Sequence, residues 1–234
     1  MPTAAVTTTH MPPDAALLRL LQLASPALPV GAYAYSQGLE YAVEAGWVKD
    51  EAGTLTWIRG VLGDVSAWTD LPMLLRLHAA WSAGDVALAG DWNARLYALR
   101  ETAELRAEDH QLGSALARVL HDLGISAAGD WLEARPACFA TLFGLAAAEW
   151  GIAPREAMLG YAWAWVENQV AAAIKLVPLG QAAGQRVLSA LQPALTDAVD
   201  VALAVGDEDL GRSMPGMVMA SVKHARMYSR LFRS

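Results

Sequence analysis

The chain has 234 residues, a formal net charge of −7 and a hydrophobic content of 55%, and its mean hydropathy is +0.27. This length suits one domain, or two small ones, with a sizeable core. The high apolar content predicts surface that another subunit covers. A single cysteine, Cys138, excludes an internal disulfide and fits a reducing cytoplasm.

The charge is distributed unevenly along the chain. Residues 223–234 contain four basic and no acidic side chains, so they carry +4 and leave −11 on the rest of a chain whose total is −7. An acidic body disfavours nucleic acid as a partner, because binding to phosphates needs a broad basic face. The basic end of the chain is instead suited to docking on an acidic protein surface.

Residues 20–39 contain no charged side chain. The length of this run would suit a membrane span, but Pro26, Pro29 and Gly31 are incompatible with a regular helix, so we expect no membrane association. Residues 1–13 lack the basic and apolar regions of a secretion signal, and their Thr- and Pro-rich composition predicts a disordered tail. We therefore expect a cytoplasmic protein.

From residue 14 onward the chain has the caps and the periodicity of successive helices. Two helices are expected over residues 36–45 and about 101–123. The others are expected to begin after Asp14, after the caps Asp50, Asp70 and Asp85, and at Pro136, Pro154, Pro178 and Pro193, and the last of them ends at Gly206. Because no β-type alternation or Asn-Gly hairpin signal occurs, we predict an all-α, single-domain bundle of about nine or ten helices. This domain would span 14–206, followed by a partner-binding C-terminal segment over 207–234.

The proline-broken loop over residues 24–40 carries four polar side chains in an otherwise apolar run: Tyr33, Tyr35, Ser36 and Gln37. An apolar, Tyr-rich loop needs a cover, which is either the core of the chain itself or another subunit. An ordinary connection between two helices is the alternative interpretation of this loop.

Signatures of chemistry are weak throughout the sequence. Ser36 does not lie in a Gly-x-Ser-x-Gly elbow, and the glycines of 180–184 lack the Lys-Ser/Thr pair of a phosphate-binding loop. No two of the five histidines are four residues apart, so we expect no catalytic residue, no cofactor and no resident metal. A weak metal site stays open, using either His10 with Met11 or His224 across a dimer axis. Mg²⁺ or Ca²⁺ at the acidic run 207–209 also stays open, although such a run is more typical of a solvated loop.

The C-terminal residues combine apolar and basic side chains. Residues 217–234 fit an amphipathic helix with Met227, Tyr228, Leu231 and Phe232 among its apolar positions, while Arg230 and Arg233 supply forked donors for carboxylates on a partner. Such a segment is often ordered only on binding. The alternative is a terminal helix that packs on the core of its own chain.

Three long blocks, in order, resemble the family of the urease accessory protein UreF. They cover residues 20–40, residues 165–185 and residues 224–234, the last ending in Arg-Leu-Phe-Arg-Ser. The resemblance implies an all-helical, homodimeric scaffold without catalytic activity. It further implies binding to UreD (also called UreH), recruitment of the GTPase UreG, and loading of nickel into apo-urease. An all-α enzyme acting on a small molecule is the alternative, which the absence of a paired acidic metal motif disfavours.

The resemblance also points to particular residues. Glu40, Lys175, His224 and Arg230 match family positions associated with function, whereas the usual His-Glu pair is His224-Ala225 here. With the loop and the C-terminal residues added, the expected partner-binding residues are Tyr33, Tyr35, Ser36, Gln37, Glu40, Lys175, His224, Tyr228, Arg230, Leu231, Phe232 and Arg233.

Overall fold

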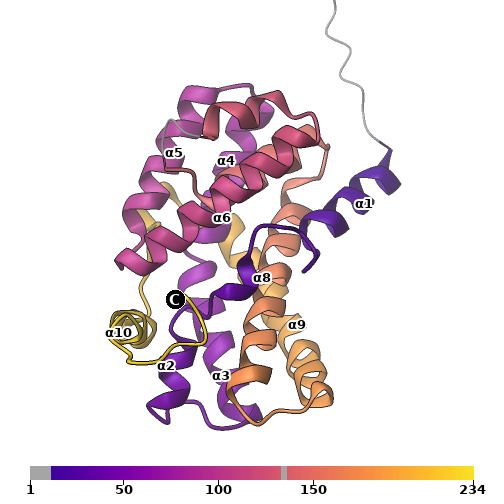
Figure 1. The fold of residues 1–234 in the computed structure, drawn as a ribbon. Helices are drawn as coiled ribbons and strands as arrows, with labels where there is room; N and C mark the ends of the chain where they lie inside the picture. The colour runs from indigo at the N-terminus through magenta and orange to yellow at the C-terminus, as the bar shows by residue number, and fades with distance from the viewer. Residues whose placement is uncertain (1–11, 133–135) are drawn as a thin grey trace, which may run out of the picture.

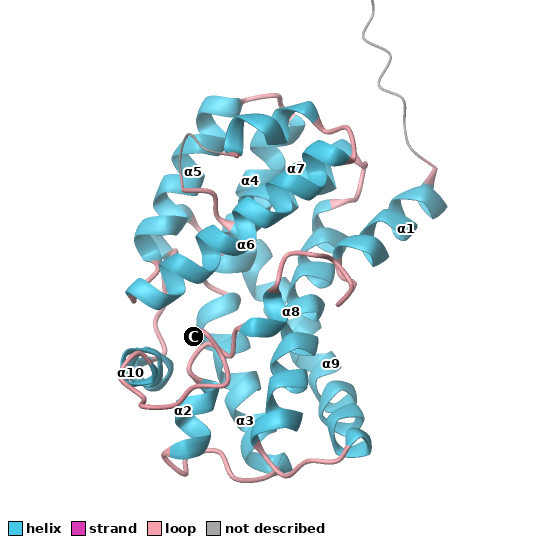
Figure 2. Cartoon of the chain, in the orientation of Figure 1, coloured by secondary structure: helices cyan, strands magenta, loops and turns pink. Residues whose placement is uncertain are grey.

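The computed structural model describes residues 12–132 and 136–234, and within these ranges it contains helices and loops but no strand (Figure 2). Residues 1–11, and with them most of the predicted N-terminal tail, lie outside the described part. The ten α-helices of the described residues confirm the prediction of an all-α single domain with about nine or ten helices.

The first half of the chain contains six α-helices. They are α1 (Pro13–Leu23), α2 (Leu39–Glu44), α3 (Glu51–Val61), α4 (Asp70–Ser82), α5 (Val86–Leu99) and α6 (Ala103–Asp122). Short helical turns occur at η1 (Ala32–Ala34), η2 (Leu62–Ser66) and η3 (Ser126–Trp131). Asp50 and Asp85 cap α3 and α5 as predicted, because each side chain accepts a hydrogen bond from a backbone N–H of the first turn.

The second half contains four α-helices. They are α7 (Phe139–Glu149), α8 (Pro154–Leu176), α9 (Gln181–Ala204) and α10 (Pro215–His224), with a short turn η4 (Asp207–Asp209) before α10. Of these, α8 and α9 are the longest helices in the described part of the chain. Helix α9 has the length and the apolar composition of a membrane-spanning helix, but the core helix of a soluble protein can have both as well. In this structure α9 packs against α3, α4 and α8.

Helix α4 lies at the centre of the bundle, where it packs against α5, α7, α8 and α9. Eight consecutive residues of α7, from 140 to 147, are buried, since this helix lies between α4 and α6. Helix α6 approaches the start of α7 so closely at Gly113 that a Cβ there would overlap the backbone carbonyl of Ala137. The sequence therefore needs a glycine at this crossing.

Three predicted helix starts at prolines differ from the structure. Pro193 does not start a helix but lies inside α9, while Pro136 precedes α7, and Pro178 precedes α9, by three residues each. Pro193 is exposed, so the carbonyl of Ser189, which loses its helical donor, can be solvated. The apolar face of α9 continues through this point, with Leu191 and Leu195 buried on either side.

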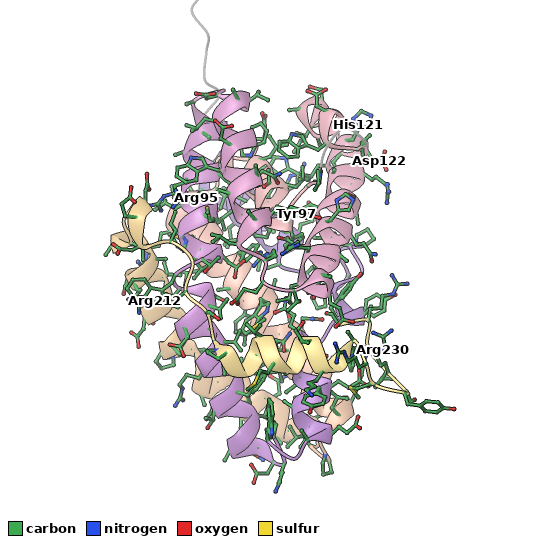
Figure 3. All side chains as sticks on the ribbon, turned by 90° about the vertical axis from the view of Figure 1, so that its left-hand side faces the viewer. Arg95, Tyr97, His121, Asp122, Arg212 and Arg230 are labelled. Carbon is green, nitrogen blue, oxygen red and sulfur yellow. The ribbon has the colours of Figure 1, made fainter. Side chains whose placement is uncertain are left out.

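The predicted helix over 36–45 is shorter in the structure, and the predicted amphipathic helix over 217–234 ends early. Helix α2 covers only 39–44, and α10 ends at His224. Residues 225–234, here called the C-terminal strap, continue as irregular backbone that returns to the middle of the molecule (Figure 1). Helix α10 lies across the long helices of the bundle (Figure 3).

Candidate functional site

The loop that contains Tyr33 to Gln37 is covered by the chain's own C-terminal part. Gly38 has a φ of 83°, and a Cβ at this position would come within 2.9 Å of the Ala220 Cβ and the Ser221 nitrogen. Only glycine accepts this backbone and lets α10 pack directly against the start of α2. The apolar loop therefore finds its cover within the same chain.

The carboxylate of Glu40 holds the C-terminal strap. Its Oε1 accepts a hydrogen bond from the backbone N–H of Leu231 (2.6 Å), and its Oε2 accepts one from the N–H of Phe232 (3.0 Å). The Nε2 of His224 donates a third hydrogen bond to Oε2 at 2.8 Å. Glu40 is only 8% exposed and His224 is fully buried, so these donors replace the water that the carboxylate loses.

A neighbouring carboxylate extends this contact on the solvent side. The Oε2 of Glu104 on α6 lies 3.4 Å from the Nδ1 of His224, and its Oε1 accepts a hydrogen bond from Arg230 at 2.9 Å. Arg230 follows the C-terminal end of α10 and is about two-fifths exposed (Figure 3). The two imidazole nitrogens of His224 therefore face carboxylates on two different helices.

The end of the strap runs beside the loop. The backbone N–H and the hydroxyl of Ser36 both donate to the carbonyl of Ser234, at 2.8 and 2.6 Å. The N–H of Arg233 donates to the carbonyl of Ala34 at 2.8 Å, and the Ser234 hydroxyl donates to Glu108 at 2.6 Å. The C-terminal end of the strap, residues 231–234, is thus fixed, and the loop with Glu40 supplies its backbone partners.

Helix α8 contacts this assembly from the other side. The amide of Gln37 donates to Glu108 (2.8 Å) and accepts from the indole N–H of Trp165 (2.8 Å). The ammonium of Lys175 lies 5.6 Å from the centre of the Phe232 ring, a cation–π contact. The hydroxyl of Tyr35 donates to Gln111 on α6. Loop, strap, α6 and α8 therefore form one hydrogen-bonded unit.

Glu108 is the buried carboxylate at the base of this unit. Burial raises its pKa to about 7, and the charge of Asp109 adds to the rise, while the hydrogen bonds from Ser234 and Gln37 act in the opposite direction. Glu108 therefore exchanges its proton near neutral pH, at the point where Gln37 and Ser234 meet.

Other side chains of the predicted site face solvent. Tyr228 is fully exposed, Leu231 is 65% exposed and Tyr33 is 71% exposed. Fixing the backbone of the strap beside the loop thus holds the apolar side chains of a small patch outward, and Met219 and Val222 of α10 are exposed as well. Such a patch is typical of a protein interface.

The sequence did not predict a buried ion-pair cluster beneath the site. Arg100 contacts Asp70 at 2.6 Å and Asp109 at 2.7 Å, and Asp109 also accepts from the N–H of Phe139, in the first turn of α7. Burial disfavours the charged guanidinium, but the charges of Asp109 and Asp70 outweigh it and raise the pKa of Arg100. The cluster fixes α4 and α6 relative to α7.

An interior pocket of about 300 Å³ lies between the loop and these helices. Its lining is mostly apolar, and the buried carboxylates that reach it are Asp70, Asp109 and Glu108. Each of them already accepts hydrogen bonds from the described residues, from Arg100 or from Gln37 and Ser234. The buried carboxylates of this pocket are therefore already paired within the chain.

The acidic run 207–209 anchors the segment that leads into α10. Arg76 donates to the carboxylate of Asp207 and to the carbonyl of Val205, and Arg95 donates to the carbonyl of Asp207. Among the described residues, no group of three or more His, Cys, Asp or Glu side chains is arranged to hold a metal ion. His10 and Met11 lie outside the described residues, and His224 is engaged by Glu40 and Glu104.

Fold and site together define an all-α protein that binds its own C-terminal strap to an internal loop and exposes an apolar patch there. Comparison with known proteins identifies the family. The UreF family model matches residues 48–192. The chain is 49% identical over 226 residues to the urease accessory protein UreF of Alkalilimnicola ehrlichii, and the aligned region covers 97% of this chain and 99% of the relative. It is 50% identical over 222 residues to the UreF of Hahella chejuensis, covering 95% of this chain and all of the relative.

The chain therefore belongs to the UreF family of urease accessory proteins.

Replacing Glu40 by alanine should release the C-terminal strap while the helical bundle stays folded. The variant leaves the N–H groups of Leu231 and Phe232 and the imidazole of His224 without their acceptor. We expect trypsin to cleave after Arg226 and Arg230 at least about tenfold faster than in the wild type, with unchanged far-UV circular dichroism. Glu44→Ala, on the exposed face of the same helix, is the control. Equal cleavage of both variants and the wild type would contradict this role.

Replacing Glu108 by glutamine should change the pH dependence of stability. Because the folded-state pKa of Glu108 lies near 7, above its unfolded value of 4.5, the folded state retains a proton that the unfolded state loses between these pH values. The free energy of unfolding therefore falls as pH rises through this window, by up to about 3 kcal/mol, and levels off above pH 7.

Urea unfolding between about pH 5 and about pH 8 measures this effect. Glu108→Gln should have a flatter profile than the wild type and a higher stability at the alkaline end. Glu149→Gln, at an exposed position, should follow the wild type. A Glu108→Gln profile parallel to that of the wild type would show that this carboxyl does not titrate differently on folding.

Proposed function

We propose that this chain is a non-catalytic scaffold of urease maturation, which acts as a cytoplasmic homodimer and helps to insert nickel into apo-urease. In this role it binds UreD/UreH and recruits or regulates the GTPase UreG. Nickel is the cargo of the assembly, not a resident cofactor of this chain. The proposal is supported by membership of the UreF family and by the exposed patch that the C-terminal strap carries.

The observation that carries the proposal is the way the strap is held. Its backbone is fixed by Glu40, Ser36 and Ala34, while Tyr228 and Leu231 point into solvent. Ordering the patch in advance reduces the entropy that a partner must overcome on binding. Large exposed side chains on a fixed backbone are the usual anchors of a protein interface.

The residues predicted from the sequence then divide into two groups. Glu40, Ser36, Gln37, Tyr35, His224, Phe232 and Lys175 act inside the chain, where they position the strap. Tyr33, Tyr228, Arg230, Leu231 and Arg233 would contact UreD/UreH directly. Substitutions in the first group would impair urease activation because the strap would no longer be held in position. Substitutions in the second group would impair it because contacts to UreD/UreH would be lost.

Affinity purification from cells that carry a complete urease operon tests the proposal. The tagged wild-type chain should retain UreD/UreH and UreG, and the cells should contain active urease. The double variant Tyr228→Ala, Leu231→Ser should retain at least about tenfold less UreD/UreH, because two anchors of about 1 kcal/mol or more each are removed. Its melting temperature should not change, since both side chains are exposed.

Leu88→Ser, at an exposed position of α5, is the matched control and should behave as the wild type. Retention of neither accessory protein by the wild-type chain would refute the scaffold role. Full retention by the double variant would place the UreD/UreH contact elsewhere on the surface.

A further inference from the structure

A second, polar pocket opens beside the C-terminal strap. Its volume is about 380 Å³, and it is formed by the loop over 30–35, one face of α6 and the strap. The face of α6 supplies His110, Ser114 and Arg118, which are four residues apart and therefore lie in a row. The strap supplies Arg233. We call this site the Arg118–Arg233 pocket.

The charge of the Arg118–Arg233 pocket is opposite to that of the chain. Two guanidinium groups line it and no carboxylate does, although the whole chain has a net charge of −7. Within the described residues Arg118 makes no hydrogen bond or ion pair, and the side chain of Arg233 contacts only the carbonyl oxygen of the Gln111 amide, at 3.3 Å. In the described part of the chain, five other arginines (Arg76, Arg100, Arg155, Arg186 and Arg230) are each paired with a carboxylate, whereas Arg118 and Arg233, like Arg59, are not.

The other polar groups of the pocket add donors. The Nδ1 of His110 accepts a hydrogen bond from the backbone N–H of Ala137 at 3.3 Å, so the ring proton of the neutral imidazole is on Nε2. Tyr33, an exposed residue, also lines the pocket. Guanidinium and imidazole N–H groups that line one concavity, with no carboxylate beside them, are suited to the oxygens of a carboxylate or a phosphate.

The position of Arg233 couples this pocket to the strap. The backbone N–H of Arg233 donates to the carbonyl of Ala34, so the guanidinium reaches the pocket only while the strap is docked. A ligand that uses both arginines binds the docked form better than the released form. By linkage, such a ligand stabilises the docked form.

We propose that the Arg118–Arg233 pocket binds an oxyanion group, a carboxylate or a phosphate, and that its occupancy stabilises the docked C-terminal strap. This site shares Tyr33 and Arg233 with the proposed partner-contact residues, but its anion binding does not rest on the proposed scaffold function. Both ligand groups offer negatively charged oxygens to the arginines. An acidic side chain of another protein would supply a carboxylate, and a free phosphate ion or a nucleotide would supply a phosphate.

Titration of the isotope-labelled chain with inorganic phosphate and, separately, with acetate tests the binding by NMR, with sodium chloride at equal ionic strength as the reference. We expect saturable shifts in the millimolar range at the backbone amides of Ser114, Arg118 and Arg233. Arg118→Gln should weaken the binding at least about fivefold, because it removes one of the two charges. Arg59→Gln removes the same charge from an exposed position of α3 that does not line the pocket, and it should bind as the wild type.

Cleavage by trypsin after Arg230 tests the coupling. Phosphate or acetate should slow this cleavage severalfold in the wild type and in Arg59→Gln, but not in Arg118→Gln. Tighter binding of acetate would identify a carboxylate as the ligand group, and tighter binding of phosphate a phosphate. The proposal would be overturned by shifts no larger than those in chloride, by equal affinity of Arg118→Gln and the wild type, or by binding that leaves the cleavage rate unchanged.

Discussion

The carboxylate of Glu40 is the contact on which the arrangement of this protein's functional surface depends. A buried carboxylate loses its hydration, which costs several kcal/mol unless donors replace the water. Here two backbone N–H groups of the strap and the imidazole of His224 supply those donors. Since all three come from the last eleven residues, burial of Glu40 and docking of the strap require each other. The carboxylate therefore acts as a structural organiser, and contacts to a partner belong to the side chains that the strap exposes.

The rest of the bundle supports this contact in layers. Gly38 lets α10 pack against the start of α2, and the arginine contacts at Val205 and Asp207 fix the segment that leads into α10. Beneath the loop, Arg100 pairs with Asp70 and Asp109 and fixes α6, the helix that carries Glu104 and Glu108, relative to α4. Removing one member of such a buried cluster leaves an uncompensated charge, so substitutions far from the surface would also disturb the strap.

Sequence analysis predicted the elements of this fold well and their contacts poorly. Local signals, such as the caps at Asp50 and Asp85, involve contacts within a few residues, so the sequence alone predicts the helix starts that they mark. Pro193 misled because a proline usually ends a helix, whereas the apolar periodicity of α9 continues through it, and Ser189, whose carbonyl loses its helical donor, lies at an exposed position. The contact between Glu40 and Leu231 joins residues 191 positions apart, and no local pattern reports such a pairing. The blocks shared with the UreF family pointed to Glu40 and His224, but not to the hydrogen bond between them.

The most direct test is amide hydrogen exchange of the free wild-type chain, followed by NMR at Leu231 and Phe232. The N–H groups of these two residues donate to Glu40, although the side chain of Leu231 is exposed and the segment has no regular secondary structure. Docking of the strap predicts that both amides exchange at least about tenfold more slowly than in an unstructured peptide of the same sequence. Exchange of both at the rate of the unstructured peptide would contradict the account, because Glu40 would then not hold the strap in the absence of a partner.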